Sequence, residues 1–356
     1  MFFLLFWLSL GGRPTIESFF PLEKMIVLEE TDEAVIVQAG QVLVADQVIY
    51  VVDRSQGFVF SYDLEGKFLG IIGAKGQGPG EYLSAERIFI GPDQSLGVLD
   101  IYAGSIIFYR KNGAYLTSMR ATGGGFPLAS DVLYQDSKLY LFGIKGGPFC
   151  GVGKHGIFNF SGFSELSLQT CFGNNIQEQT LLKFGHIAFQ PVVRPVGHQF
   201  WFFHPYHNEI ECYGMNGEKL SSFHYPDVEL MQWSEVSQLN SENDLDVMAR
   251  EKNRLIDLIP LEDKLVVEKT SLFGKQRFVV YDLIALDGKP LAQRLRYAGP
   301  VLCQSDGMLR SFFGLFDSEL GRSSQRKSYP NEYQYLEKAG IPLDPDLKII
   351  RMGKLK

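Results

Sequence analysis

The sequence predicts an all-β fold, a closed ring of six four-stranded antiparallel sheets, and three observations lead to this prediction. The 356 residues include 28 phenylalanines, 16 tyrosines and 37 glycines, a composition that favours short strands joined by many turns. Glycines of tight turns recur at near-regular intervals. A strand ending in Val-x-Asp keeps step with the first two of these turns.

The turns mark a structural repeat. In each, glycine follows Glu, Asn, Ser or Asp and supplies the positive φ that a tight hairpin needs; the glycines are Gly66, Gly113, Gly162, Gly217 and Gly288. The intervals are 47, 49, 55 and 71 residues, and the last is long because a polar, helix-prone segment, 228–252, is inserted. Asp53 and Asp100 each precede the turn glycine of their unit by 13 residues. Two markers in one phase indicate a repeat of about fifty residues.

Each repeat contains four short runs of strand-forming residues. The runs are 42–45, 48–52, 58–62 and 68–72 in the first unit and 87–90, 96–99, 106–109 and 115–119 in the second. Such units are the blades of a β-propeller, and five turns mark five blades. A sixth is expected from both chain ends, with strands 301–304, 308–313 and 347–352 and an outer strand 25–28. Closure of the ring removes an open sheet edge. Seven blades or an open array are the alternatives, but six agrees best with the count.

The stretch from Phe68 to Asp100 is expected to join the first two blades. Four glycines surround Pro79 at 73, 76, 78 and 80, so neither a strand nor a helix continues there. The link has no GK[ST] and no amphipathic helix after it, so neither phosphate-binding fingerprint is met.

We expect one propeller domain over residues 25–356, with helical insertions at about 228–252 and 321–346. Residues 1–24 begin with about ten apolar residues, too few to span a bilayer. This segment resembles the apolar part of an export signal but lacks a positive first region and a clear cleavage site. No cysteine that could accept a lipid follows it.

Charge and cysteine content restrict the function. The net charge of -7 and the absence of a basic stripe argue against nucleic acid and anionic membranes as partners. The cysteines at 150, 171, 212 and 303 form no CxxC pair, which disfavours structural zinc. Cys150 and Cys171 flank an expected hairpin turn and could form a disulfide in an oxidising compartment, although two buried thiols are slightly favoured.

The sequence FLGIIGAKGQGPGEY, followed by a strand and V-x-D, resembles an NHL-type repeat. More closely, the chain is similar to bacterial six-bladed β-propeller proteins with a G-x-G-P-G-E-Y link after the first blade. Segment 27–34 is similar to their L-E-T-x-D-E segment, and 347–352 suits their closing strand. The resemblance implies the fold and export to the periplasm or cell surface, often as lipoproteins, although the lipobox cysteine is missing here. The wider group includes protein-binding modules, lactonase-like metal hydrolases and lyases, so the resemblance chooses no activity.

Topology predicts where a site would lie. In an up-and-down blade, the turn between the second and third strands shares one end with the blade-to-blade link. Asp53, Asp100 and Glu81 should therefore share a face, together with His204, which is in phase with the aspartates, and the adjacent Tyr206. The aspartates more often cap the following turn, and Glu81 is expected to bind backbone amides of the neighbouring blade.

His204, His207 and Glu209 could bind a divalent metal, with a carboxylate from another blade. Their spacing matches neither HExxH nor a facial triad, so an ordinary polar loop is the favoured interpretation. No other cofactor is indicated.

The sequence contains no complete catalytic set. The favoured function is therefore non-catalytic recognition of a protein or glycan on this face. The alternative is a metal-dependent, lactonase-like hydrolase or lyase with its site in the central funnel.

Overall fold

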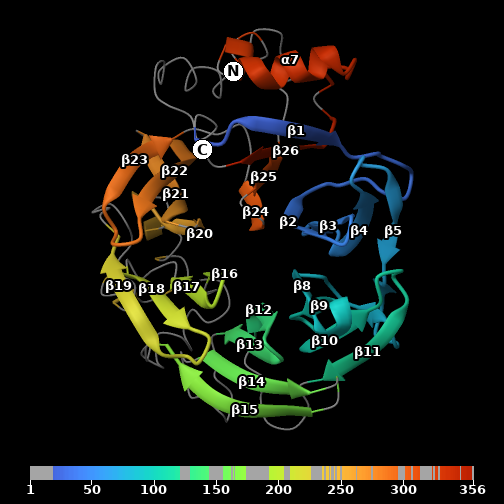
Figure 1. Ribbon diagram of the computed structural model, residues 1–356, viewed down its shortest axis with the longest axis vertical. Helices are drawn as coiled ribbons and strands as arrows, with labels where there is room; N and C mark the ends of the chain where they lie inside the picture. Colours follow the sequence, from blue (N-terminus) through green and yellow to red (C-terminus); the bar gives the residue numbers. More distant parts are fainter. Residues whose placement is uncertain are drawn as a thin grey trace.

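The computed structural model describes residues 19–120, 129–143, 155–173, 192–203, 209–225, 251–295, 301–312 and 323–354, with gaps of one or two residues, and scattered positions between 235 and 248. Six four-stranded antiparallel sheets form a ring (Figure 1), and we call its centre the channel. The first blade is β2 (Ala39–Ala45), β3 (Val48–Asp53), β4 (Phe58–Asp63) and β5 (Phe68–Ile72). The second is β8 (Arg87–Ile90), β9 (Leu96–Asp100), β10 (Ser105–Tyr109) and β11 (Tyr115–Arg120).

The next three blades repeat this meander. The third is β12 (Ala129–Gln135), β13 (Lys138–Gly143), β14 (His155–Ser161) and β15 (Glu165–Phe172). The fourth is β16 (Val192–Val196), β17 (Gln199–Phe203), β18 (Glu209–Gly214) and β19 (Lys219–His224). The fifth is β20 (Leu255–Pro260), β21 (Lys264–Phe273), β22 (Gln276–Ala285) and β23 (Pro290–Leu295).

The sixth blade confirms that both chain ends close the ring. It consists of β24 (Val301–Ser305), β25 (Met308–Phe312), β26 (Ile349–Lys354) and, outermost, β1 (Leu22–Val27). Strand β1 runs antiparallel to β26, with Met25 opposite Arg351. The all-β, six-bladed prediction is therefore confirmed, and β1 begins three residues before the expected position.

Neighbouring blades are held together by apolar side chains that both sheets bury. One cluster joins Val52 and Val59 of the first blade to Ile88, Val98 and Ile107 of the second. Each large apolar side chain buried in this way contributes about 1.5–3 kcal/mol relative to exposure. The blades are therefore fixed to one another as well as closed in a circle.

Helix α7 (Pro330–Lys338) covers the outer side of the closing blade (Figure 1). Its buried residues Tyr333 and Leu336 pack in one cluster with Met25 of β1 and Ile349 of β26. The helix ends before Gly340, which adopts φ +67°, a conformation that glycine accepts without strain. This helix lies in the segment expected to be helical near the C-terminus.

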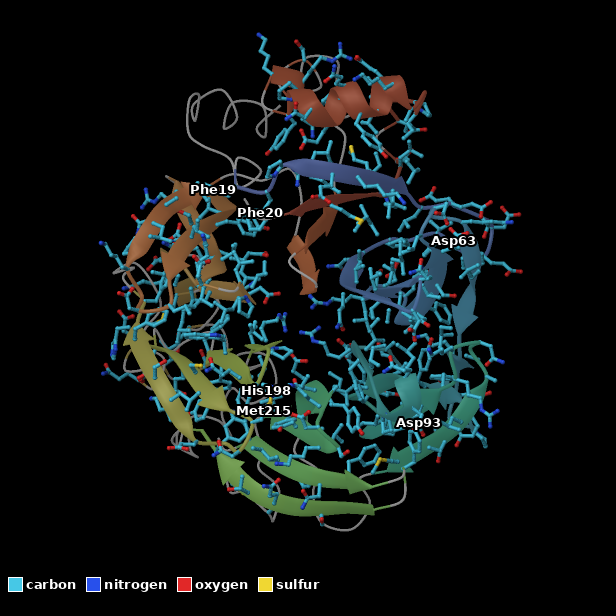
Figure 2. All side chains as sticks on the ribbon, in the orientation of Figure 1. Phe19, Phe20, Asp63, Asp93, His198 and Met215 are labelled. Atoms are coloured by element: carbon cyan, nitrogen blue, oxygen red, sulfur yellow. The ribbon has the colours of Figure 1, made fainter. Side chains whose placement is uncertain are left out.

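Arg351 on β26 connects three separate parts of the chain. Its side chain is almost completely buried, and Nε donates to Glu332 Oε1 of α7 at 2.7 Å. Nη2 donates to the carbonyl of Phe20 at 2.8 Å. The Phe20 ring packs in the fifth-blade cluster with Tyr281 (Figure 2). One guanidinium thus links the entering chain, the closing strand and the covering helix.

We predict that Arg351→Ala lowers the free energy of unfolding by about 3–5 kcal/mol, because it leaves the Glu332 carboxylate buried without its cation. Arg326→Ala is the matched control. It removes an exposed ion pair with Glu337 on the same helix, so its cost should be about 1 kcal/mol or less. Urea unfolding followed by circular dichroism measures both, and equal losses would contradict the role of Arg351.

Candidate functional site

Asp53 and Asp100, predicted to face a ligand, are fully buried, and backbone amides occupy their carboxylates. Asp53 Oδ1 accepts from the amides of Ser55 and Gln56 at 2.8 and 2.9 Å, and Oδ2 accepts from Val37. The first pair lies in the turn after β3, and Val37 lies in the segment that enters β2. The carboxylate therefore ties these two segments together.

Asp100 repeats this arrangement in the second blade. Its Oδ1 accepts from the amides of Tyr102 and Ala103 at 3.0 and 2.9 Å, and Oδ2 accepts from Leu83 in the link. Both aspartates thus cap the following turn and also clamp the incoming link. They shape the predicted face from within rather than presenting a carboxylate to solvent.

Glu81 holds its own link in shape. Its Oε2 accepts from the amide of Gly78 at 2.8 Å, so the partner lies in the same link and not in the neighbouring blade. A Cβ at Gly76 would lie 2.0 Å from Glu81 Oε2, and Gly76 has φ +152°. Glycine is required there for both reasons.

The residues predicted for metal binding are described only in part. His204, Tyr206 and His207 lie outside the described residues. Glu209 begins β18, and its Oε1 is 2.9 Å from Lys219 Nζ. Among the described residues, no three His, Cys, Asp or Glu side chains are grouped to hold a metal.

Cys171 on β15 is disulfide-bonded, so the slightly favoured reading of two buried thiols is wrong for this residue. Its expected partner, Cys150, lies outside the described residues. Cys212 is a free, buried thiol.

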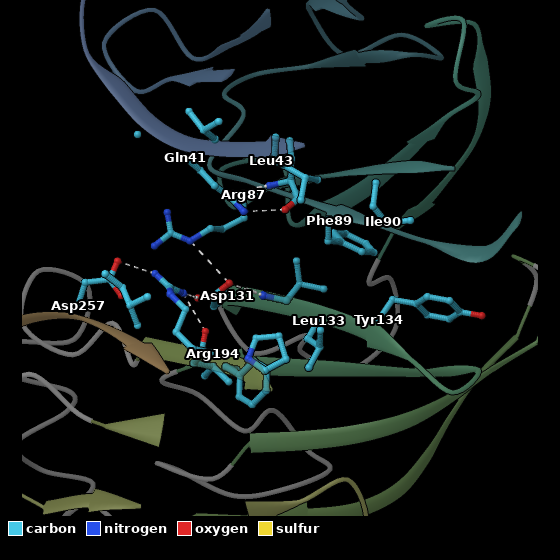
Figure 3. Close-up of a pocket in the computed structure, with 18 of the residues that line it drawn as sticks. Gln41, Leu43, Arg87, Phe89, Ile90, Asp131, Leu133, Tyr134, Arg194 and Asp257 are labelled. Atoms are coloured by element: carbon cyan, nitrogen blue, oxygen red, sulfur yellow. Dashed lines mark hydrogen bonds and ion pairs between the residues drawn. The ribbon is translucent and has the colours of Figure 1, made fainter. Parts of the chain in front are cut away.

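The structure reveals a polar pocket that the sequence did not predict. It is a cavity of about 310 Å³ in the channel, lined by the inner strands of five blades, β2, β8, β12, β16 and β20 (Figure 3). Its charged lining residues are Arg54, Arg87, Asp131, Arg194 and Asp257. Most stand near the starts of inner strands, so they gather at the end of the channel where the links enter.

Arg194 is the centre of an ion-pair network. Its Nη1 lies 3.2 Å from Asp131 Oδ2 and its Nη2 lies 2.7 Å from Asp257 Oδ2 (Figure 3). Burial disfavours the charge, but the two carboxylates outweigh burial and raise the Arg194 pKa above its ordinary value. Arg87 Nε lies 3.6 Å from the other oxygen of Asp131. Four blades, the second to the fifth, are thus joined by charges inside the channel.

Arg54 has no such partner among the described residues. Within the described part of the chain, its guanidinium makes no hydrogen bond or ion pair, although its side chain lines the pocket. Arg54 is exposed, yet partial desolvation by the pocket walls, and then the like charge of Arg87, lower its pKa, while Glu86 and Asp257 oppose this shift. A Cβ at Gly40 would lie 2.5 Å from Arg54 Cγ and 2.7 Å from Nε, so the missing side chain at Gly40 makes room for the arginine.

Glu268 lies behind the pocket as a second titratable group. It faces Asp257 across β20 and β21 and is only 6% exposed. Burial, followed by the charge of Asp257, raises its pKa to about 8. Glu268 is therefore mostly protonated at neutral pH.

A detectable sequence signal for this pocket was missed. Each of β8, β12, β16 and β20 carries a charged residue, Arg87, Asp131, Arg194 and Asp257, within its first three positions of an otherwise largely apolar strand. A charge in a strand that lines the centre of a propeller must either pair with another charge or face the channel.

Residues 13–264, more than two thirds of the chain, match the sequence family described as 6-bladed beta-propeller. The chain belongs to this family. The resemblance to six-bladed propellers found in the sequence is thereby confirmed. No curated protein matches the sequence.

Solved structures agree with the family's fold. A Bacteroides fragilis protein described as a "putative exported protein" has a TM-score of 0.67 and 15% identity over 96% of this chain and 97% of its own. A member of the DUF4221 family from Bacteroides vulgatus has a TM-score of 0.60 and 8% identity over 95% and 98%. Virginiamycin B lyase from Staphylococcus aureus reaches a TM-score of only 0.48 at 10% identity over 81% and 80%, so it supports no functional inference. At these identities the likeness shows the fold alone.

In the part of the chain that the structure describes, no helix is both long and apolar enough to cross a membrane.

We predict that Asp100→Ala costs about 3 kcal/mol of unfolding free energy, because it removes a buried acceptor from three backbone amides. Asp63→Ala is the control. Asp63 also accepts from two turn amides, of Glu65 and Lys67, but these bonds are exposed, so we expect about 1 kcal/mol or less. The urea midpoints of the two variants test this, and a smaller loss for Asp100→Ala than for Asp63→Ala would contradict the clamp.

We further predict that Glu268 makes the protein less stable as pH rises. The unfolded side chain ionises near pH 4.5, whereas the folded one stays protonated to about pH 8. Stability is therefore lost between these values, by an amount on the order of 4 kcal/mol. Glu268→Gln should remove this loss, so the free energy of unfolding of the variant rises relative to that of the wild type between pH 5 and 8. Exposed Glu65→Gln is the control, and parallel pH profiles of wild type and Glu268→Gln would refute the shift.

Proposed function

We propose that this propeller is a non-catalytic recognition protein that binds an anionic group of a protein or glycan in the channel pocket, on the face formed by the blade-to-blade links. The observation that carries the proposal is the position of Arg54. Its guanidinium lines the pocket beside Arg87, makes no described ion pair, and has a pKa lowered by its surroundings. An anion between the two arginines would reverse that unfavourable environment.

The carboxylates of the pocket do not fill this place. Asp131 contacts both Arg87 and Arg194, and Asp257 contacts Arg194. Arg87 Nε is buried without a hydrogen bond among the described atoms. A buried donor without an acceptor costs about 1–3 kcal/mol, which a ligand carboxylate, sulfate or phosphate could recover. Arginine suits such a group because its planar fork matches paired oxygens.

The pocket is held in place before a ligand arrives. Arg194 fixes the third, fourth and fifth blades through its carboxylate contacts. Gln41 joins the first two blades, since its side-chain amide pairs with the backbone N–H and C=O of Ile88 at 2.9 Å each. A preformed site lowers the entropy lost on binding.

The lining residues favour binding over conversion. Among the described lining residues there is no serine, cysteine, histidine or lysine to act as a nucleophile or imidazole base. The cationic groups of the pocket are instead three arginines, of which Arg87 and Arg194 are paired with aspartates, and this arrangement suits recognition.

We also propose that the protein is exported to the periplasm or cell surface. The disulfide at Cys171 supports this location, because disulfides persist mainly in oxidising compartments. The short apolar N-terminal run supports it as well.

The proposed function predicts that citrate and sulfate bind the wild-type protein, measured by isothermal titration calorimetry at low ionic strength and pH 7. Arg54→Gln should weaken this binding at least tenfold. Gly40→Ala should also weaken it, because a methyl group there displaces the Arg54 side chain without removing its charge. Arg326→Gln, at an exposed arginine on the outer helix segment, should leave binding unchanged.

The proposal fails if neither anion binds, or if Arg54→Gln and Arg326→Gln bind equally well. Turnover of lactones or esters that depends on a bound divalent metal would instead support the hydrolase or lyase alternative. Elemental analysis of the purified protein accompanies the titrations for this reason.

A further inference from the structure

Four exposed apolar side chains lie on the face where the links enter. They are Val35, Val37, Leu83 and Tyr102, with exposed fractions of 48, 61, 39 and 71%, and we call them the apolar rim. Val35, Val37 and Leu83 lie in the segments that enter the first and second blades, and Tyr102 lies in the turn after β9. All four therefore belong to the end of the ring that holds the channel arginines.

The backbone beneath the rim is rigidly held. The amides of Val37, Leu83 and Tyr102 donate to the buried carboxylates of Asp53 and Asp100. The side chain of Gln56 donates to the carbonyl of Val35. These bonds use only backbone atoms of the rim, so the apolar side chains are free to make contacts. An ordered apolar surface held outward in this way suits recognition.

The rim borders the pocket through short stretches of chain. Residue 38, next to Val37, accepts through its carbonyl from the amide of Arg54 at 2.8 Å. Leu83 lies four residues before Arg87, and its carbonyl accepts from Lys75 Nζ at 2.7 Å. The Lys75 side chain therefore contacts the rim directly, and short stretches of chain connect the rim to Arg54 and Arg87 of the pocket.

We infer that the apolar rim and the pocket together bind an extended peptide segment of a partner protein. A carboxylate of the peptide enters the pocket between Arg54 and Arg87, and its neighbouring apolar side chains cover the rim. This inference rests on the proposed function and narrows its ligand from a protein or glycan to a peptide. Complementary charge fixes the anchor, and burial of aliphatic surface adds affinity.

The chemistry of the rim favours a peptide over a sugar. Three of the four side chains are aliphatic and carry no hydrogen-bonding group. A sugar ring pressed against them would bury hydroxyls without hydrogen-bond partners, which is unfavourable. Leucine, valine or phenylalanine side chains of a peptide carry no such cost.

The test is selection of a random heptapeptide library on the wild-type protein, followed by titration of the enriched peptides. We expect enriched peptides to combine a carboxylate with adjacent large apolar residues. The double variant Val37→Ser, Leu83→Ser should weaken their binding at least tenfold, since it keeps both backbone clamps but removes the apolar surface. The control Leu69→Ser, Leu220→Ser changes two exposed leucines on outermost strands, 54 and 48% exposed, and should bind normally.

Two chemical arms identify the carboxylate. Amidation of the peptide C-terminus and replacement of Glu or Asp by the amide are compared on the same peptide. If amidation of the C-terminus weakens binding, the carboxylate that enters the pocket is the chain end; if the amide replacement weakens it, the carboxylate is a side chain. If neither change weakens binding, the inference is wrong.

The rim variant also separates this inference from the proposed function. If citrate binding still depends on Arg54 but the selected peptides bind the rim variant as tightly as the wild type, the inference is wrong and the proposed anion pocket is retained. Oligosaccharides of galacturonate that bind more tightly than any selected peptide, equally in wild type and rim variant, would overturn the inference in favour of a glycan. If the wild-type protein binds no anion, both the proposed function and this inference are wrong.

Discussion

The structure depends on the pairing of β1 with β26, because this single ladder turns six sheets into a closed ring. Its two strands come from opposite ends of the chain, so forming it requires closure of a loop of more than three hundred residues. That closure carries an entropic cost, although the cost grows only slowly with loop length. Arg351 stabilises the seam from both sides, through Glu332 of α7 and the carbonyl of Phe20. Two hydrogen bonds partly offset the cost of burying this ion pair, while Arg351 Nη1 is buried without a partner among the described atoms.

Closure of the ring brings the charges of the channel together. Arg87, Asp131, Arg194 and Asp257 come from four blades and are spread over more than 170 residues of sequence. In an isolated blade each would meet water. In the ring they face one another across a narrow space, where ion pairs form and the pKa values of Arg54, Arg194 and Glu268 shift. The pocket is thus a property of the whole circle rather than of any repeat.

The acidic and basic groups of the face have different tasks. Asp53 and Asp100 are buried and hold backbone amides, which positions the links. Arg54 follows Asp53 directly, yet it turns into the channel because Gly40 leaves room for it. The recurring aspartates therefore build the support, and the residues that differ between blades supply the chemistry. This division explains how one scaffold can carry different sites.

The sequence by itself determined the blade count, the closing strands and the face on which links and turns meet. These depend on local chemistry, namely turn glycines, alternating apolar residues and the Val-x-Asp phase, which act within about fifty residues. It also indicated that Asp53 and Asp100 would cap turns. Only the tertiary structure decided that the pocket is built by Arg54, Arg87 and Arg194 and that Glu268 is protonated, because contacts between blades far apart in sequence set both. Charges spaced by whole blades leave no short motif, and burial acts on each only after the ring has closed.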